Sequence, residues 1–289
     1  MEESVVADFT GRVHTRDFGG KEPVPGRVLL SQRRLVLASE SGRTTIGLKQ
    51  VFDVAVGTVP SDLQSFFSDT ITVAYVDGDA KRTAVIEGEP EPMDRFQRIL
   101  FKTLLDGVSV RVRSPAKVGG RVVDGDVQTA AVSLGDGEIG FVDCTDPFTV
   151  DLSTVMDFDR GEHTIDGTPR PTLSITHAPE TGAITSLVSV PNERTLGVLG
   201  RFIKLEYAEV MEDVRDLDLT DEELEILVSL YSAGGEASIS TIVTGDATQA
   251  SMVLETLREG GLVADGETAT ALTPKGRMVV NTYLEKVNA

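Results

Sequence analysis

One phrase occurs twice in this chain, and the resulting internal repeat limits the folds open to it. Residues 46–54 read IGLKQVFDV and residues 150–158 read VDLSTVMDF, an offset of 104 positions. This period is far longer than the roughly 20 to 50 residues of a solenoid unit, so the repeat predicts duplicated domains. The matching apolar positions are expected to be core positions of one strand present in both copies: Leu48 with Leu152, and Val51 with Val155.

Each copy is expected to contain several strands followed by one helix. In the first copy, β-branched and alternating runs predict strands at 27–31, 34–39, 70–76 and 82–87. A helical pattern then starts at Met93, with one apolar stripe formed by Phe96, Ile99, Leu100, Thr103 and Leu104. The second copy repeats this order and ends with a helix over 193–207, whose stripe contains Leu196, Leu199, Ile203 and Tyr207.

The order of elements predicts the fold of the two copies. About seven antiparallel strands followed by one helix is the layout of a pleckstrin-homology-like barrel, in which the helix caps an open end of the sheet. We therefore predict two tandem pleckstrin-homology-like antiparallel β-barrels, each with a C-terminal helix, over residues 1–107 and 108–216. A β-sandwich with an appended helix is the alternative.

The last third of the chain, residues 217–289, changes from strand to helix patterns. A capping box from Thr220 to Glu223 predicts the start of the first helix. A short helix near 238–243, a longer one over 247–261, a hairpin over 262–273 and a final helix over 274–287 are expected to follow. This order predicts a winged helix-turn-helix, so the fold class is multidomain α+β.

Charge and composition restrict the surroundings and the partners of the protein. The 27 basic and 46 acidic residues give a formal net charge of −19, dispersed along the chain, as expected for adaptation to molar salt. One cysteine, Cys144, excludes an internal disulfide. The acidic start and the lack of a long apolar run predict a cytoplasmic protein without direct membrane insertion.

Several short motifs suggest chemistry, but their contexts do not support it. GDGEIG (135–140) has the glycine spacing of a dinucleotide site, yet strands are expected on both sides, which favours a hairpin turn. The acidic turns at 77–79 and 157–161 lack the remaining ligands of a calcium loop. The three histidines show no metal-ligand spacing. We therefore predict no enzyme activity, no catalytic residues, no metal and no cofactor.

Basic residues in the first copy raise the question whether it binds an anionic ligand. The first copy concentrates basic residues around its early strands: Arg27, Arg33, Arg34, Arg43 and Lys49. Strand alternation divides these side chains between two faces, which favours a solvated or partner-binding face over a phosphoinositide pocket.

The predicted winged helix makes a DNA-binding transcription regulator the alternative function. Its second helix has one basic residue, Arg258, and residues 218–289 contain four basic against twelve acidic residues, a net charge of −8. Because affinity for DNA depends largely on neutralised phosphates, we expect protein contacts and no nucleic acid.

The combined phrases GRVLLSQRRLVLAS, IGLKQVFDV, VDLSTVMDF, DLTDEELEILVSLYS and LTPKGR resemble the archaeal taxis protein CheF family, in a haloarchaeal version, over nearly the whole chain. The resemblance implies a non-enzymatic chemotaxis and phototaxis adaptor. It would link the phosphorylated CheY-type response regulator to the switch proteins of the archaellum, at the cytoplasmic face of that motor. It also implies a homodimer and contacts with other Che proteins.

The resemblance places the response regulator on the C-terminal part of the chain, and we expect the contact on the last helix. Arg277 and Lys286 are scarce cations in an acidic region. An apolar stripe on the same helix, with the spacing of a groove-binding helix, consists of Val280, Tyr283, Leu284 and Val287. Packing of this stripe into the core of the winged helix is the alternative.

Overall fold

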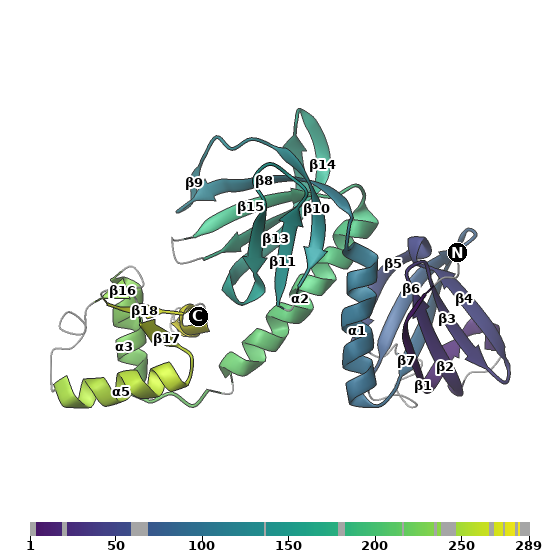
Figure 1. The fold of residues 1–289 in the computed structure, drawn as a ribbon, viewed down its shortest axis with the longest axis horizontal. Coiled ribbons are helices and arrows are strands. Elements are labelled where there is room, and N and C mark those ends of the chain that lie inside the picture. Colours follow the sequence, from purple (N-terminus) through teal and green to yellow (C-terminus); the bar gives the residue numbers. More distant parts are fainter. Residues whose placement is uncertain are drawn as a thin grey trace.

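The computed structural model describes residues 4–18, 22–58, 69–135, 137–178, 183–215, 217–233, 236–237, 247–265, 269–273, 275–280 and 283. Two sheets with one long helix each are followed by a smaller group of helices and short strands, which we call the C-terminal unit (Figure 1).

The first sheet has seven antiparallel strands and is followed by one helix. The strands are β1 (Val5–Thr15), β2 (Val24–Ser31), β3 (Arg34–Ser39), β4 (Gly42–Gly47), β5 (Val51–Val56), β6 (Ile71–Asp77) and β7 (Ala80–Glu87), and the helix is α1 (Pro90–Leu105). Their order in the sheet is β4-β3-β2-β1-β7-β6-β5. The helix begins three residues before the predicted Met93, because Pro90 suits the first helical turn, where no intrahelical N–H bond is needed.

The second sheet repeats this topology. Its strands are β8 (Ser109–Val118), β10 (Gln128–Leu134), β11 (Glu138–Val142), β12 (Phe148–Asp151), β13 (Val155–Ile165), β14 (Thr168–His177) and β15 (Ile184–Ser189), with the short β9 (Arg121–Val122) beside β8. The order β12-β11-β10-β8-β15-β14-β13 corresponds strand by strand to the order of the first sheet. Helix α2 (Glu193–Arg215) follows and extends beyond its predicted end at 207.

The prediction of barrels needs correction, because neither sheet is a closed barrel. The edge strands of the first sheet are β4 and β5, those of the second are β12 and β13, and no pairing joins either pair within the described residues. The chain turns between each pair through one turn of 3-10 helix, η2 (Leu48–Gln50) and η3 (Leu152–Thr154). This turn redirects the chain, so the two edge strands diverge.

The repeated phrase lies at these two turns and is therefore not one continuous strand. In each copy it contains the end of one strand, the 3-10 turn and the start of the next strand. The leucine and valine pairs are in the core as predicted, at 0 to 5% exposure, and their spacing of three suits a helix with three residues per turn. The backbone contact is also repeated, since the Leu48 N–H donates to Arg33 O and the Leu152 N–H donates to Gly137 O, both at 2.8 Å.

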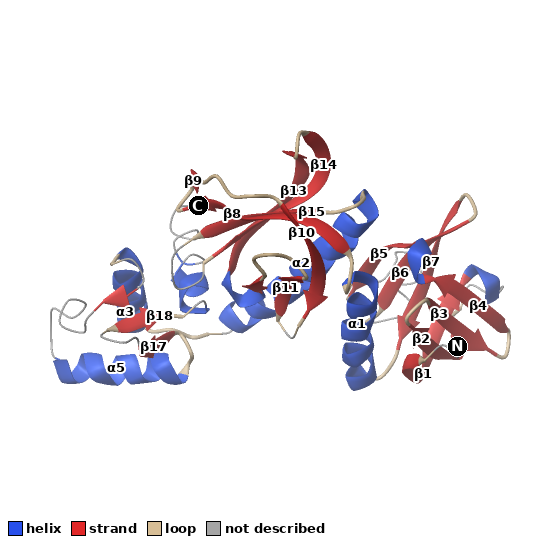
Figure 2. Ribbon diagram, turned by 45° about the horizontal axis from the view of Figure 1, so that its top comes forward, coloured by secondary structure: helices blue, strands red, loops and turns tan. Residues whose placement is uncertain are grey.

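Both long helices are buried on two sides. Helix α1 contacts β1 of its own sheet, β10 of the second sheet and helix α2, and α2 packs against β5 of the first sheet as well as against η3 and β14 (Figure 2). The Phe101 and Phe202 rings lie between the helices with centroids 5.6 Å apart. One hydrophobic core consequently contains residues of both sheets, and the division at 107 and 108 stays a prediction.

The C-terminal unit has a separate core. It comprises α3 (Asp221–Ser232), β16 (Glu236–Ala237), α5 (Ala247–Glu259), β17 (Val263–Asp265) and β18 (Thr270–Leu272), followed by helical residues 275–280 and 283. The predicted capping box is present, with the Thr220 N–H donating to Glu223 Oε2 at 2.7 Å. The predicted hairpin is confirmed by the pairing of β17 with β18, whereas the predicted helix near 238–243 lies outside the described residues.

Candidate partner-binding surfaces

The side chains that the sequence offers for catalysis or metal binding are dispersed in the structure. No group of three or more His, Cys, Asp or Glu residues that could hold a metal ion occurs in the described part of the chain. His177 lies 6% exposed in the second sheet, with Nε2 at 3.4 Å from Ser186 Oγ, and burial lowers its pKa. Residues 138–140 of GDGEIG begin strand β11, which pairs antiparallel with β10 as the predicted hairpin requires.

The last helix brings together only part of the predicted contact residues. Val280 is completely buried in the core of the C-terminal unit, so its side chain follows the core-packing alternative. Tyr283 is 39% exposed, and Arg277 is partly exposed. Three further residues of the prediction, Leu284, Lys286 and Val287, lie outside the described residues.

Helix α5, the second helix of the predicted winged helix-turn-helix, has its one cation engaged in ion pairs. The Arg258 guanidinium donates to Asp265 Oδ1 at 2.6 Å and also to Glu255 on its own helix. The hydrogen bond with Asp265 is the main reason that the pKa of Arg258 is raised. A guanidinium held by two carboxylates is poorly placed to neutralise a DNA phosphate.

The junction between the two sheets depends on two arginines of α2. The Arg194 guanidinium donates to the carbonyl oxygens of Leu48 and Lys49, at the 3-10 turn of the first sheet, and its burial lowers its pKa. Arg201 Nε lies 3.1 Å from Asp53 Oδ1 on β5. Hydrogen bonds from a charged donor to backbone carbonyls restrict geometry, so these contacts orient the second sheet relative to the first.

A groove lies along this junction, and we call it the junction groove. It has a volume of about 220 Å³ and is lined from both copies of the repeat: Val54, Ala55, Val56, Thr58 and Phe101 from the first, and Arg201, Lys204, Leu205 and Ala208 from the second. The wall contributed by β5 and α1 is mainly apolar, while α2 adds two cations.

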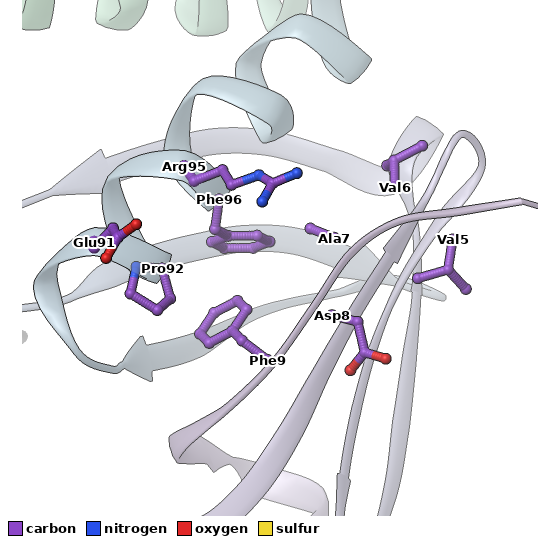
Figure 3. Close-up of a pocket in the computed structure, with 9 residues that line it drawn as sticks. All are labelled: Val5, Val6, Ala7, Asp8, Phe9, Glu91, Pro92, Arg95 and Phe96. Carbon is purple, nitrogen blue, oxygen red and sulfur yellow. The ribbon is translucent and has the colours of Figure 1, made fainter.

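A second groove lies between β1 and α1, and we call it the edge groove. It has a volume of about 410 Å³ and is lined by Val5, Val6, Ala7, Asp8 and Phe9 of β1 and by Glu91, Pro92, Arg95 and Phe96 of α1 (Figure 3). The Phe9 and Phe96 rings pack together with centroids 5.3 Å apart. The Asp8 carboxylate does not take part in this ring contact. It accepts two hydrogen bonds from Arg27, at 2.7 and 2.6 Å, and these lower its pKa.

Neither groove was predicted from the sequence. Both depend on contacts between segments far apart in the chain, which a pattern within one element does not contain. The sequence contains one local signal for the edge groove, the apolar pair Val5 and Val6, and the structure shows that Val5 is 52% exposed.

Comparison with known proteins shows to which family this architecture belongs. The family described as Archaeal Chemotaxis signal transduction system protein F matches residues 5–209, which contain both sheets and most of α2. The chain is 39% identical to "Taxis protein CheF2" of Halobacterium salinarum over 288 residues, covering 100% of both chains. It is 21% identical to "Taxis protein CheF1" of the same organism over 257 residues, covering 87% of this chain and 85% of that relative. The chain therefore belongs to the archaeal chemotaxis signal transduction protein F family, the CheF family.

Proposed function

We propose that this protein is a non-enzymatic adaptor that links the phosphorylated CheY-type response regulator to the switch proteins of the archaellum. Membership of a chemotaxis signal transduction family supports a role in taxis. The observation that carries the adaptor role is the separation of two hydrophobic cores, one in the paired sheets and one in the C-terminal unit. Two separately packed parts provide surfaces for two partners.

The proposed fold assignments agree with this role. The seven-stranded order followed by a helix fits a pleckstrin-homology-like domain, and the helices with a β-hairpin in the C-terminal unit fit a winged helix. Within the described residues, no helix is both long and apolar enough to cross a membrane. We place the adaptor in the cytoplasm, at the archaellum motor, as a homodimer that also contacts other Che proteins.

We assign the response-regulator contact to the last helix. Tyr283 is 39% exposed and Arg277 is partly exposed, and tyrosine and arginine side chains are frequent centres of binding energy. Leu284, Lys286 and Val287 follow in the sequence and complete the proposed contact, while Val280 supports it from the core.

The test compares binding of the full chain to its response regulator with and without beryllofluoride, which mimics the acyl phosphate. We expect clearly tighter binding of the activated form, and Arg277→Glu combined with Tyr283→Ala should weaken it by about tenfold or more. Arg43→Glu is the matched control, because it makes the same charge reversal at an exposed position on β4. This variant should bind like wild type. Equal binding of activated and unactivated regulator would contradict the adaptor proposal.

The alternative, a transcription regulator, has one direct test. If the C-terminal unit bound DNA, Arg258→Glu would abolish sequence-specific retention on DNA in molar salt. Because Arg258 is already paired with two carboxylates, we expect no such retention in the wild-type protein.

A further inference from the structure

The N-terminal half of β1 has one edge without a strand partner. On one side β2 pairs with β1 from Val5 to Val13, whereas on the other side β7 pairs only from Arg12 to Thr15. A Cβ on Gly11 would lie 2.2 Å from the Glu87 carbonyl oxygen, so the two backbones cross closely where β7 ends. Within the described chain, the backbone groups on this edge of residues 5–11 have no strand to bond.

The second copy of the repeat does not have this long open edge. Strand β15 pairs with β8 back to Arg111, and β8 begins at Ser109, directly after the turn that follows α1. Only Ser109 and Val110 extend beyond the β15 pairing. The open edge is thus a specific property of the first copy, acquired by the longer start of β1.

The edge groove lies along this open edge and has the shape that an added strand requires. Helix α1 forms the opposite wall, with Pro92, Arg95 and Phe96 facing Val6, Ala7 and Phe9 across the groove (Figure 3). Backbone donors and acceptors along one side, and side chains that can contact the added strand on the other, are the two elements of peptide recognition by strand addition.

The charge of the groove indicates which segment fits it. Arg95 is exposed, its guanidinium extends from α1 towards β1 in Figure 3, and it has no ion pair among the described residues. Asp8, the carboxylate on the strand, is already paired with Arg27. Glu91 points away from the Val5 end of the groove in Figure 3. Near Val6, where Arg95 extends across the groove and Glu91 does not reach, this cation favours an incoming segment that carries a carboxylate at that position.

We propose that the edge groove binds an extended acidic and apolar segment of a partner protein, which adds as an eighth strand to residues 5–11 of β1. Its apolar side chains contact Val6, Phe9 and Pro92, and one of its carboxylates pairs with Arg95. This site is distinct from the response-regulator contact on the last helix, so either proposal can fail alone.

A second copy of this chain fits the groove less well than such a segment. Two β1 edges paired about a twofold axis would offer each Arg95 only the strand residues 5–11 of the other copy. The acidic residue in that stretch is Asp8, which is held by two hydrogen bonds from Arg27. Strand β1 of a second copy therefore offers Arg95 no carboxylate that is not already paired.

The experiment uses the full chain and fluorescein-labelled heptapeptides, whose length matches residues 5–11. A peptide of alternating valine and glutamate is compared with one of alternating valine and lysine, by fluorescence anisotropy in about 0.1 M and about 1 M potassium chloride. Non-specific attraction to a chain of net charge −19 favours the lysine peptide, and a Debye length of about 3 Å at 1 M screens it. We expect the glutamate peptide to bind more tightly at both salt concentrations.

Two changes test the two parts of the contact. Arg95→Glu should weaken glutamate-peptide binding by about fivefold or more, whereas Arg43→Glu, also at an exposed position but on the edge strand β4, should not. N-methylation of alternate peptide nitrogens on the pairing side should abolish binding, and bound peptide should slow hydrogen exchange at β1 amides between residues 5 and 11.

Three results would overturn the proposal: stronger binding of the lysine peptide at 1 M salt, binding unaffected by N-methylation, or equal losses in the Arg95 and Arg43 variants. A change from dimer to monomer in the Arg95 variant, measured by light scattering, would instead assign the groove to a second copy.

Discussion

Truncation of Phe202 tests whether the two sheets share one core. Phe202 is 4% exposed on α2 and packs against Phe101 of α1, which is 1% exposed, with ring centroids 5.6 Å apart. Replacing a buried phenylalanine by alanine costs about 3 to 5 kcal/mol, and an aromatic pair adds about 0.5 to 1.5 kcal/mol beyond burial. We expect Phe202→Ala to lower the free energy of unfolding by about 3 to 5 kcal/mol, through loss of packing between the sheets.

Urea unfolding followed by circular dichroism, at constant salt, measures this loss. Phe148→Ala is the matched control, because Phe148 also stacks on a buried ring, Phe141 at 4.7 Å, but is half-buried on the edge strand β12. It should cost about 1 kcal/mol. A double-mutant cycle of Phe101→Ala and Phe202→Ala should give a coupling of about 0.5 to 1.5 kcal/mol. A Phe202 loss below about 1 kcal/mol, or no coupling, would refute a shared core.

Three further changes have defined expectations. Thr220→Ala removes the capping box of α3 and should cost about 0.5 to 2 kcal/mol in urea unfolding, whereas Thr220→Ser should cost less. Burial lowers the pKa of His177 below its usual 6.5, so the unfolded chain takes up a proton more readily than the folded one. The contribution of His177 to the free energy of unfolding should therefore be constant above about pH 6.5 and fall below it. The difference in unfolding free energy between wild type and His177→Gln, measured over a pH series, should show this dependence. A Cβ on Gly276 would lie 2.1 Å from Leu262 O, so Gly276→Ala should destabilise the C-terminal unit by about 1 to 3 kcal/mol, while Gly161→Ala, with room for a Cβ, should change stability by less than about 0.5 kcal/mol.

Sequence patterns predicted the elements well where the information is local. The strand at 34–39, the capping box at Thr220 and the doubling of the sheet all follow from periodicity, from side-chain hydrogen bonding to the backbone and from internal similarity. The 3-10 turn inside the repeated phrase was missed, because leucine and valine three residues apart also fit the end of a strand with a bulge.

Contacts between the two copies could not be predicted in the same way. The stripe assigned to the first helix omitted Phe101, and the stripe assigned to the second omitted Val198 and Phe202, yet all three are buried. Each helix has a second buried side that faces the other copy, and a single-stripe pattern describes only one side. The grooves were missed for the same reason, since they exist only after the copies and the strand β1 are placed.

The partly predicted contact on the last helix shows the same limit. Val280, Tyr283 and Arg277 share one helix, and the pattern alone leaves open which side faces the core. The structure places Val280 inside and Tyr283 at the surface. Position on a helix stripe thus indicated burial at Val280, while a partner contact of the remaining stripe residues stays a prediction.

The Phe101–Phe202 contact has a consequence for how this family changes over time. A duplicated gene segment is ordinarily free to diverge copy by copy, provided that each copy keeps its own interior. Here a change of side-chain volume on α1 leaves a void or a clash on α2, 101 positions later in the chain. We expect substitutions at these two positions to be correlated among related sequences. Selection on packing then acts on both copies of the repeat together.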